Sequence, residues 1–89
     1  MLTLSIFKKI IDMVHSEYPD VLFGAGTIRN KKAAIDFLEA GADFLVSPVF
    51  DDDVNEVCNE NNVHYIPGCA TPTEIHNASK KGVEVFKLF

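Results

Sequence analysis

The sequence predicts an α/β fold in which about four parallel strands alternate with helices, as part of a (β/α)8 barrel. Short apolar runs begin near residues 21, 44, 63 and 85, and helical patterns separate them. Successive runs lie roughly 20 to 23 residues apart, which is typical of strand–helix units joined by right-handed crossovers. The runs are continuously apolar, as in strands that helices cover. This short and regular period suits a barrel better than a doubly wound sheet.

The first expected element is a helix over residues 4–18, where Leu4, Phe7, Ile11 and Val14 recur at helical spacing. Pro19 disfavours helix at the residue before it. Residues 21–23 are then expected to form a buried strand that runs into a glycine-containing turn.

The remaining elements follow in order, each bounded by a capping residue or a glycine. Helices are expected over residues 31–40, 51–60 and 71–81, and strands over 43–48, 63–68 and 83–89. Asn30 and Thr71 are placed as N-caps, with Pro72 in the first turn of the last helix. Gly41 and Gly82 are placed just past helix ends.

The length bounds the domain organisation. Eight strand–helix units require roughly 200 residues or more, and this chain has 89 residues with four strands. Residues 1–89 are therefore expected to be a fragment of a single barrel domain that lacks the first strands and the last strands.

Composition excludes several classes of function. A net charge of −5 argues against a sequence-independent grip on nucleic acid. Two cysteines, Cys58 and Cys69, are too few for a disulfide scaffold, so a reducing cytoplasm is the expected compartment. Lys8, Lys9 and Asp12 interrupt the apolar N-terminal stretch, which indicates neither a signal peptide nor a membrane span.

A lysine interrupts the last apolar run, GVEVFKLF. Alternation along a strand places Val85, Lys87 and Phe89 on one face, and Phe86 with Leu88 on the other. If the bulky pair lies under the helices, Lys87 points into the barrel near the end that carries catalytic groups. A lysine that loses hydration there has a lowered pKa, and its neutral amine can form a Schiff base with a carbonyl. The alternative is an edge-strand lysine that reaches water and prevents aggregation.

The other strand ends carry GAGT, SP and PGCATPTE. Two glycines before Thr27 would let the backbone approach a ligand and present the hydroxyl, although an ordinary glycine-containing turn has the same letters. GAGT lacks the third glycine of a dinucleotide-binding loop.

Taken together, VLFGAGTIRN, AGADFLVSPVFDDDV, PGCATPTEI and GVEVFKLF resemble the 2-dehydro-3-deoxyphosphogluconate (KDPG) aldolase family, which includes 4-hydroxy-2-oxoglutarate aldolase activity. The resemblance implies a (β/α)8 barrel and class I aldol chemistry without a cofactor. It implies that Lys87 forms the Schiff base and that Thr27 holds the pyruvate carboxylate. It also implies that Pro48 and Phe89 line the pocket.

The resemblance further implies a substrate, products and an assembly. The substrate would be 2-dehydro-3-deoxy-6-phosphogluconate, cleaved to pyruvate and glyceraldehyde 3-phosphate, with 4-hydroxy-2-oxoglutarate as another substrate. A homo-oligomer, a trimer in the full-length family, is implied, with no nucleic-acid or membrane partner. The family's general-base glutamate and carboxylate-binding arginine have no counterpart here, and Thr3 stands where that arginine would align. We therefore expect these 89 residues alone to be inactive.

Two other functions stay open at this point. One is a barrel synthase or isomerase that uses Lys87 as a point charge toward phosphate. The other is a non-catalytic half-barrel that associates with itself. A metal site at Asp51, Asp52, Asp53 and Glu56 is the weaker interpretation of those acids, because acidic residues also cap and complement a helix N-terminus. His15, His64 and His76 lie on different expected elements without a ligand spacing, and Cys69 is expected to be a small buried residue.

Overall fold

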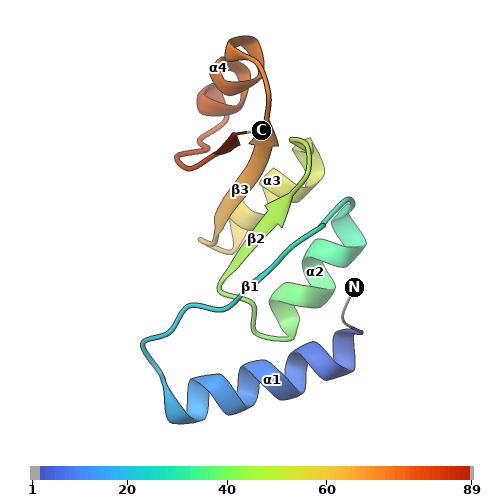
Figure 1. Ribbon diagram of the computed structural model, residues 1–89. Helices are drawn as coiled ribbons and strands as arrows, with labels where there is room; N and C mark the ends of the chain where they lie inside the picture. Colours follow the sequence, from blue (N-terminus) through green and yellow to red (C-terminus); the bar gives the residue numbers. More distant parts are fainter. Residues whose placement is uncertain (1–2, 89) are drawn as a thin grey trace.

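The computed structural model describes residues 3–88, in which helices and strands alternate (Figure 1). The helices are α1 (Leu4–Glu17), α2 (Lys31–Glu39), α3 (Asp52–Glu60) and α4 (Pro72–Lys80). The strands are β1 (Gly24–Ala25), β2 (Phe44–Ser47), β3 (His64–Cys69) and β4 (Lys87–Leu88). All neighbouring strands are parallel and follow the order β1-β2-β3-β4, which confirms the expected sequential sheet.

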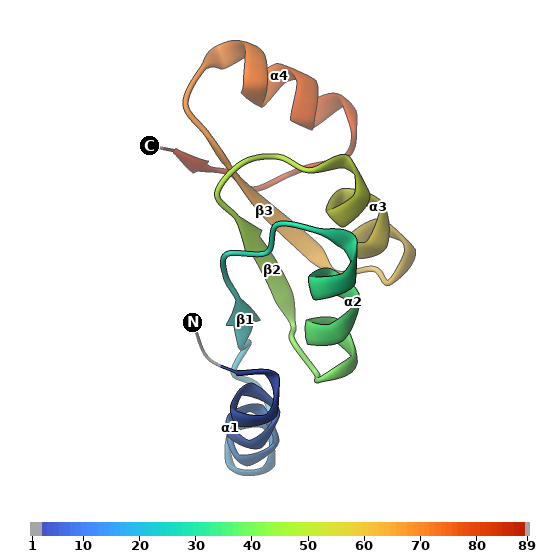
Figure 2. The same cartoon turned by 90° about the vertical axis from the view of Figure 1, so that its right-hand side faces the viewer.

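The register of the sheet sorts its side chains onto two faces. Leu45 pairs with Tyr65, and Val46 pairs with Ile66. Leu45 and Tyr65 are buried on the face that α2 and α3 cover, whereas Val46 and Ile66 are half-buried on the opposite face. No helix in the described part of the chain covers that second face, and α1 and α4 lie at opposite ends of the row of strands (Figure 2). We call the uncovered side the open face.

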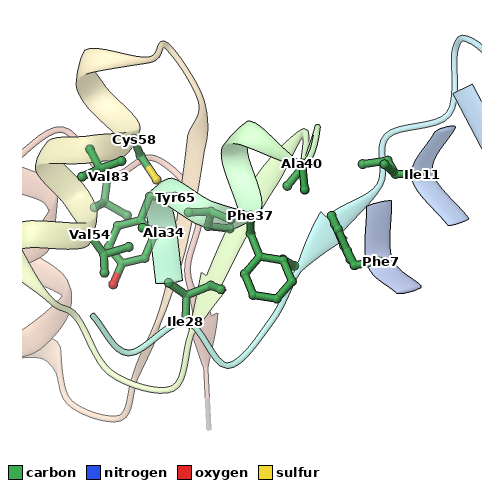
Figure 3. Packing of buried hydrophobic residues seen from close by; sticks show 14 of the residues in the cluster. Phe7, Ile11, Ile28, Ala34, Phe37, Ala40, Val54, Cys58, Tyr65 and Val83 are labelled. Carbon is green, nitrogen blue, oxygen red and sulfur yellow. The ribbon is translucent and has the colours of Figure 1, made fainter. Parts of the chain in front are cut away.

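The hydrophobic core lies between the sheet and the helices (Figure 3). The ring of Phe7 from α1 meets the ring of Phe37 from α2 edge to face, with centroids 5.0 Å apart. The cluster continues along the covered face through Leu45 and Val54, both fully buried. Burial of these apolar side chains supplies the main driving force for folding.

The helix boundaries follow the predicted caps. The side chain of Asn30 accepts a hydrogen bond from the Ala33 N–H at 2.8 Å. Thr71 forms a capping box with Glu74, and Pro72 occupies the first turn of α4. Gly41 and Gly82 have φ values of +108° and +94°, a conformation that glycine adopts without a Cβ clash.

The first strand differs from the expectation. Val21 and Leu22 are 45% and 70% exposed, and β1 begins only at Gly24. The Phe23 N–H bonds to the carboxylate of Asp43 at 2.7 Å, and the Asp43 N–H bonds to the Phe23 carbonyl at 2.8 Å. The Asp43 side chain therefore takes the Phe23 N–H, only one backbone bond joins the strands here, and Val21 and Leu22 stay exposed. The prediction of a buried strand over residues 21–23 was wrong.

The last strand is also shorter than expected, because regular pairing covers only Lys87 and Leu88. Phe86 packs against the core as predicted, but Leu88 is 71% exposed. Its expected place under a helix was wrong, because no described segment covers this end of the sheet. Phe89 lies outside the described residues. Among the described residues, no helix is long and apolar enough to cross a membrane.

Candidate active site at the carboxyl edge of the sheet

The loops that follow the strands meet at one edge of the sheet, as the parallel order requires. A cavity of about 180 Å³ lies there, lined by Thr27, Val46, Ser47, Pro48 and Lys87. Its volume equals that of roughly six water molecules, at roughly 30 Å³ each in the liquid. The cavity can therefore hold a small organic acid. Three of the four residues singled out from the sequence line it together, and the fourth, Phe89, lies outside the described residues.

Thr27 adopts an uncommon backbone conformation, with a φ of +59°. A β-branched residue is strained in this left-handed region. The next residue explains the strain, because Ile28 is fully buried and its N–H bonds to the Val46 carbonyl at 3.0 Å. The buried isoleucine anchors the loop to β2 and leaves Thr27 to make the turn, so the exposed threonine is held beside the cavity.

Ser47 fastens the same loop from the other side, and the sequence reasoning missed it. Its side chain is 1% exposed, and its hydroxyl donates a hydrogen bond to the Ile28 carbonyl. Both backbone polar groups of Ile28 are therefore bound to β2. The signal in the sequence was a hydroxyl residue within an otherwise apolar strand, but its partner lies 19 residues away.

Lys87 begins β4 and pairs with Gly68 of β3. Residues opposite one another in a parallel sheet point to the same side, so Lys87 shares the open face with Val46 and Ile66. This orientation matches the predicted inward direction. The side chain is exposed, however, and the expected loss of hydration is absent from this structure. The reason is that no described segment covers the open face above it.

The loop after Pro48 is held by a buried tyrosine. The Tyr65 hydroxyl accepts a hydrogen bond from the Asp51 N–H at 3.0 Å and lies 3.3 Å from the Val49 carbonyl, to which it donates. Burial is the largest of the causes that raise the pKa of Tyr65. The phenol therefore stays protonated and can donate its hydrogen bond to the Val49 carbonyl. This contact positions the segment that carries Pro48.

Two ionisable groups near this edge are unsuited to proton transfer or attack. The Glu74 carboxylate accepts bonds from the Ala70 N–H at 3.1 Å and from the hydroxyl and N–H of Thr71, each at 3.0 Å, and these bonds lower its pKa. Cys69 is 1% exposed, and burial, with a smaller contribution from Glu74, raises the pKa of its thiol. Glu74 is a helix cap, and Cys69 is a buried thiol of low reactivity.

The acidic residues 51–53 lie at the N-terminus of α3, where they cap the helix and form an ion pair. Asp51 is the N-cap and accepts a bond from the Val54 N–H at 3.0 Å, as predicted. Asp52 forms an ion pair with Lys81. Within residues 3–88, no group of three or more His, Cys, Asp or Glu side chains is arranged to hold a metal ion.

A second cavity of about 250 Å³ opens at the opposite edge, where the strands begin. Its lining includes Asn55, His64 and Glu84. The Asn55 amide donates to the Lys81 carbonyl at 3.2 Å, and so holds the end of α4. In parallel α/β barrels this edge contributes to stability while the carboxyl edge carries chemistry, so the smaller cavity beside Lys87 is the candidate active site.

The parallel strand–helix units in the order β1-β2-β3-β4, with Lys87 beside the cavity at their carboxyl edge, define part of a (β/α)8 barrel. The model of one family, KDPG and KHG aldolase, matches residues 2–89. The chain belongs to that family.

Several known proteins that the chain resembles are named as aldolases of this family. It is 42% identical over 84 residues to the 2-dehydro-3-deoxy-phosphogluconate aldolase of Treponema pallidum, covering 94% of this chain and 40% of that protein. The crystal structure of the 4-hydroxy-2-oxoglutarate/2-dehydro-3-deoxyphosphogluconate aldolase from TTHB1 superimposes with a TM-score of 0.82 at 38% identity, covering 97% of this chain and 40% of that one.

A second similar structure contains a reaction intermediate. The KDPG aldolase of Legionella pneumophila, 29% identical with a TM-score of 0.77, holds pyruvate captured as a covalent carbinolamine. The superposition covers 92% of this chain and 40% of that one. The chain thus spans about 40% of the length of the relatives it matches.

Proposed function

We propose that this chain supplies the Schiff-base lysine of a class I aldolase that cleaves 2-dehydro-3-deoxy-6-phosphogluconate to pyruvate and glyceraldehyde 3-phosphate, with 4-hydroxy-2-oxoglutarate as a second substrate. One observation carries the proposal. Lys87 lines a single cavity with Thr27 and Pro48, at the carboxyl edge of a parallel sheet. Covalent capture of pyruvate by the Legionella relative supports the same chemistry.

The reaction begins at the Lys87 amine. Its neutral form adds to the C2 carbonyl of the keto acid, and the resulting carbinolamine loses water to give an iminium. A base takes the proton of the C4 hydroxyl, the C3–C4 electron pair moves into the iminium, and glyceraldehyde 3-phosphate leaves. The remaining enamine takes a proton at C3, and water hydrolyses the pyruvate iminium to release pyruvate and restore the amine.

The other lining residues orient the pyruvate portion. The Thr27 hydroxyl, held outward by the strained turn, donates a hydrogen bond to the substrate carboxylate. Pro48 presents an apolar ring that limits water in the cavity, and Phe89 is proposed to do the same. The iminium itself accepts the electron pair, so these steps call for no metal or other cofactor.

The base is proposed to lie outside these 89 residues. Glu74 is the acid closest in sequence to the end of β3, and it is occupied as a cap. We propose that residues 1–89 form part of one barrel domain whose first and last strands supply the base and the phosphate-binding groups. The 89-residue chain alone should then trap pyruvate without efficient turnover.

The proposal also covers the cellular compartment and the oligomeric state. Cys58 and Cys69 are both free and buried, which suits a reducing cytoplasm. We propose a homo-oligomer that acts on small molecules, a trimer in the full-length family, without a nucleic-acid or membrane partner.

Borohydride trapping tests the proposed chemistry. Incubation with pyruvate and borohydride should attach one reduced pyruvate to Lys87, located by peptide mass spectrometry, whereas Lys87→Ala should remain unlabelled. Label spread over Lys80, Lys81 and Lys87 alike would contradict a specific Schiff base. Phosphate binding without any trapped adduct would favour a phosphate-handling synthase or isomerase instead.

A further inference from the structure

The loop between β2 and α3, residues 48–51, lies between two cavities. Pro48 lines the candidate active site on one side. On the other side Val49 and Phe50 line a cavity of about 310 Å³, whose remaining walls come from α4 and its C-cap Lys81. Space therefore lies on both sides of the loop, so close packing alone does not fix its position. Specific bonds have to hold it where Pro48 meets the substrate.

The Tyr65 hydroxyl supplies two such bonds. It accepts a hydrogen bond from the Asp51 N–H at 3.0 Å and donates one to the Val49 carbonyl at 3.3 Å. The Tyr65 side chain belongs to a residue that is only 5% exposed, and its ring lies within the hydrophobic core (Figure 3). Because the core is close-packed, the hydroxyl has little freedom to move. It therefore fixes the loop backbone at two points directly after Pro48.

A weaker set of contacts holds the loop from outside. The ring centroid of Phe50 lies 5.9 Å from that of Tyr65, and the Lys81 Nζ lies 5.3 Å from the Phe50 centroid. Lys81 also forms an ion pair with Asp52, but these two side chains are 49% and 69% exposed. Exposed ion pairs and cation–π contacts contribute little to stability. The buried hydroxyl of Tyr65 is therefore the main attachment of the loop.

Tyr65 takes no direct part in the proposed chemistry. It pairs with Leu45 on the face that α2 and α3 cover, whereas Lys87 belongs to the open face. A substrate bound to Lys87 thus lies across the sheet from the Tyr65 ring. Any effect of the phenol on the reaction passes through the loop and Pro48, so its role is to position a wall of the cavity.

We propose that Tyr65 is a positioning residue for pyruvate binding, because its hydroxyl holds the 48–51 loop and so keeps Pro48 against the substrate. The inference rests on the proposed function, since the substrate occupies the same cavity. Tyr65→Phe keeps the packed ring and removes only the two loop bonds. The loop can then move toward the cavity of about 310 Å³ behind it, and Pro48 moves away from the substrate. Pyruvate should bind more weakly, while the Lys87 amine, on a different strand, keeps its reactivity.

Borohydride trapping on the full chain at a series of pyruvate concentrations tests this role. For Tyr65→Phe the half-saturating pyruvate concentration should rise roughly two- to tenfold, the equivalent of one neutral hydrogen bond. The amount of adduct at saturation, and its dependence on pH, should match the unmodified chain because the Lys87 amine is unaltered. Amide hydrogen exchange followed by NMR should show that the Asp51 N–H loses protection in the variant.

Two control variants separate positioning from general stability. Tyr18→Phe makes the same chemical change at a tyrosine that is 61% exposed, so it should alter neither stability nor the half-saturating concentration. His15→Ala removes the 2.8 Å hydrogen bond to Asp43, on the side of the molecule away from Lys87. It should therefore lower stability without raising the half-saturating concentration.

The outcomes distinguish this role from the proposed function. An unchanged half-saturating concentration in Tyr65→Phe, or an equal rise in His15→Ala, would overturn the positioning role and leave the Lys87 Schiff base intact. Unaltered protection of the Asp51 N–H would overturn the attachment of the loop itself. An unmodified chain that traps no pyruvate would contradict the proposed function, and the positioning role with it, even if the Asp51 N–H lost its protection in Tyr65→Phe.

Discussion

The hydroxyl of Ser47 on β2 donates a hydrogen bond to the carbonyl of Ile28 in the loop after β1. Both groups are buried, and the Ile28 N–H is bound to the Val46 carbonyl as well. This pair of bonds holds the turn that places Thr27 at the cavity. These two bonds join β2 to the loop that carries Thr27, so their loss should affect both stability and ligand binding.

Ser47→Ala should therefore lower the free energy of unfolding by about 1–3 kcal/mol, because it leaves the buried Ile28 carbonyl without its partner. Urea denaturation followed by circular dichroism measures the change. Ser79→Ala, at an exposed position of α4, is the matched control and should stay within about 0.5 kcal/mol of the unmodified chain. Equal effects at the two positions would mean that the Ser47 bond does not stabilise the loop.

Thr27→Gly should separate stability from binding. Removing the Cβ relieves the backbone strain at a φ of +59°. The free energy of unfolding should therefore increase by up to about 1 kcal/mol. Pyruvate trapping should decrease at the same time, because the hydroxyl is lost. Thr73→Gly, in the helical conformation of α4, should instead lower stability slightly. A Thr27→Gly chain that traps pyruvate as fast as the unmodified one would refute the proposed carboxylate contact.

Lys87→Arg should abolish pyruvate trapping although it preserves the positive charge. A guanidinium stays protonated at any pH that the protein tolerates, so it cannot act as an amine nucleophile. Because the side chain is exposed, the substitution should leave the unfolding midpoint unchanged. A trapped adduct in Lys87→Arg at the unmodified rate would assign the Schiff base to another lysine.

Stability should fall in alkali because of Cys58. Burial raises the pKa of this thiol from 9.0 to about 11. The unfolded chain loses its proton near pH 9 while the folded chain keeps it to about pH 11, so the folded state binds more protons in this window. The stability present below pH 9 should then decrease up to pH 11, by as much as about 3 kcal/mol.

Urea denaturation at a series of pH values measures this slope, and Cys58→Ala should flatten it. Tyr65 and Cys69, whose pKa values burial also raises, contribute in the same direction and remain in both chains, so the slope should decrease without vanishing. An identical pH dependence in the Cys58→Ala chain would show that the thiol ionises at its ordinary pKa in the folded state.

Much of the architecture could be predicted from local pattern. The spacing of apolar runs led to the parallel order, and the capping residues Asn30 and Thr71 marked helix starts that the structure confirms. Caps act within three or four residues, so they are visible in a short stretch of sequence. Pattern placed the ends of the parallel strands at one edge, and the family resemblance singled out Thr27, Pro48 and Lys87 there, which line one cavity.

The errors have one physical origin, which is contact between distant residues. The Asp43 carboxylate takes the Phe23 N–H that a longer β1 would have used, across 20 positions of the sequence. Ser47 was missed because its partner lies 19 positions away. The exposure of Lys87 and Leu88 depends on what covers the open face, and no pattern within a single strand reports that.

Asp43 also binds the His15 side chain, Nε2 to Oδ2, at 2.8 Å, so one carboxylate ties α1, the approach to β1 and the start of β2 together. This clamp lies at the edge of the sheet opposite the Lys87 cavity. Asp43 and His15 thus support the fold from the end of the strands that lies away from the proposed chemistry. Such a division makes the fold evolvable, because the loops that surround a substrate can change through drift or selection while the clamp keeps the scaffold intact.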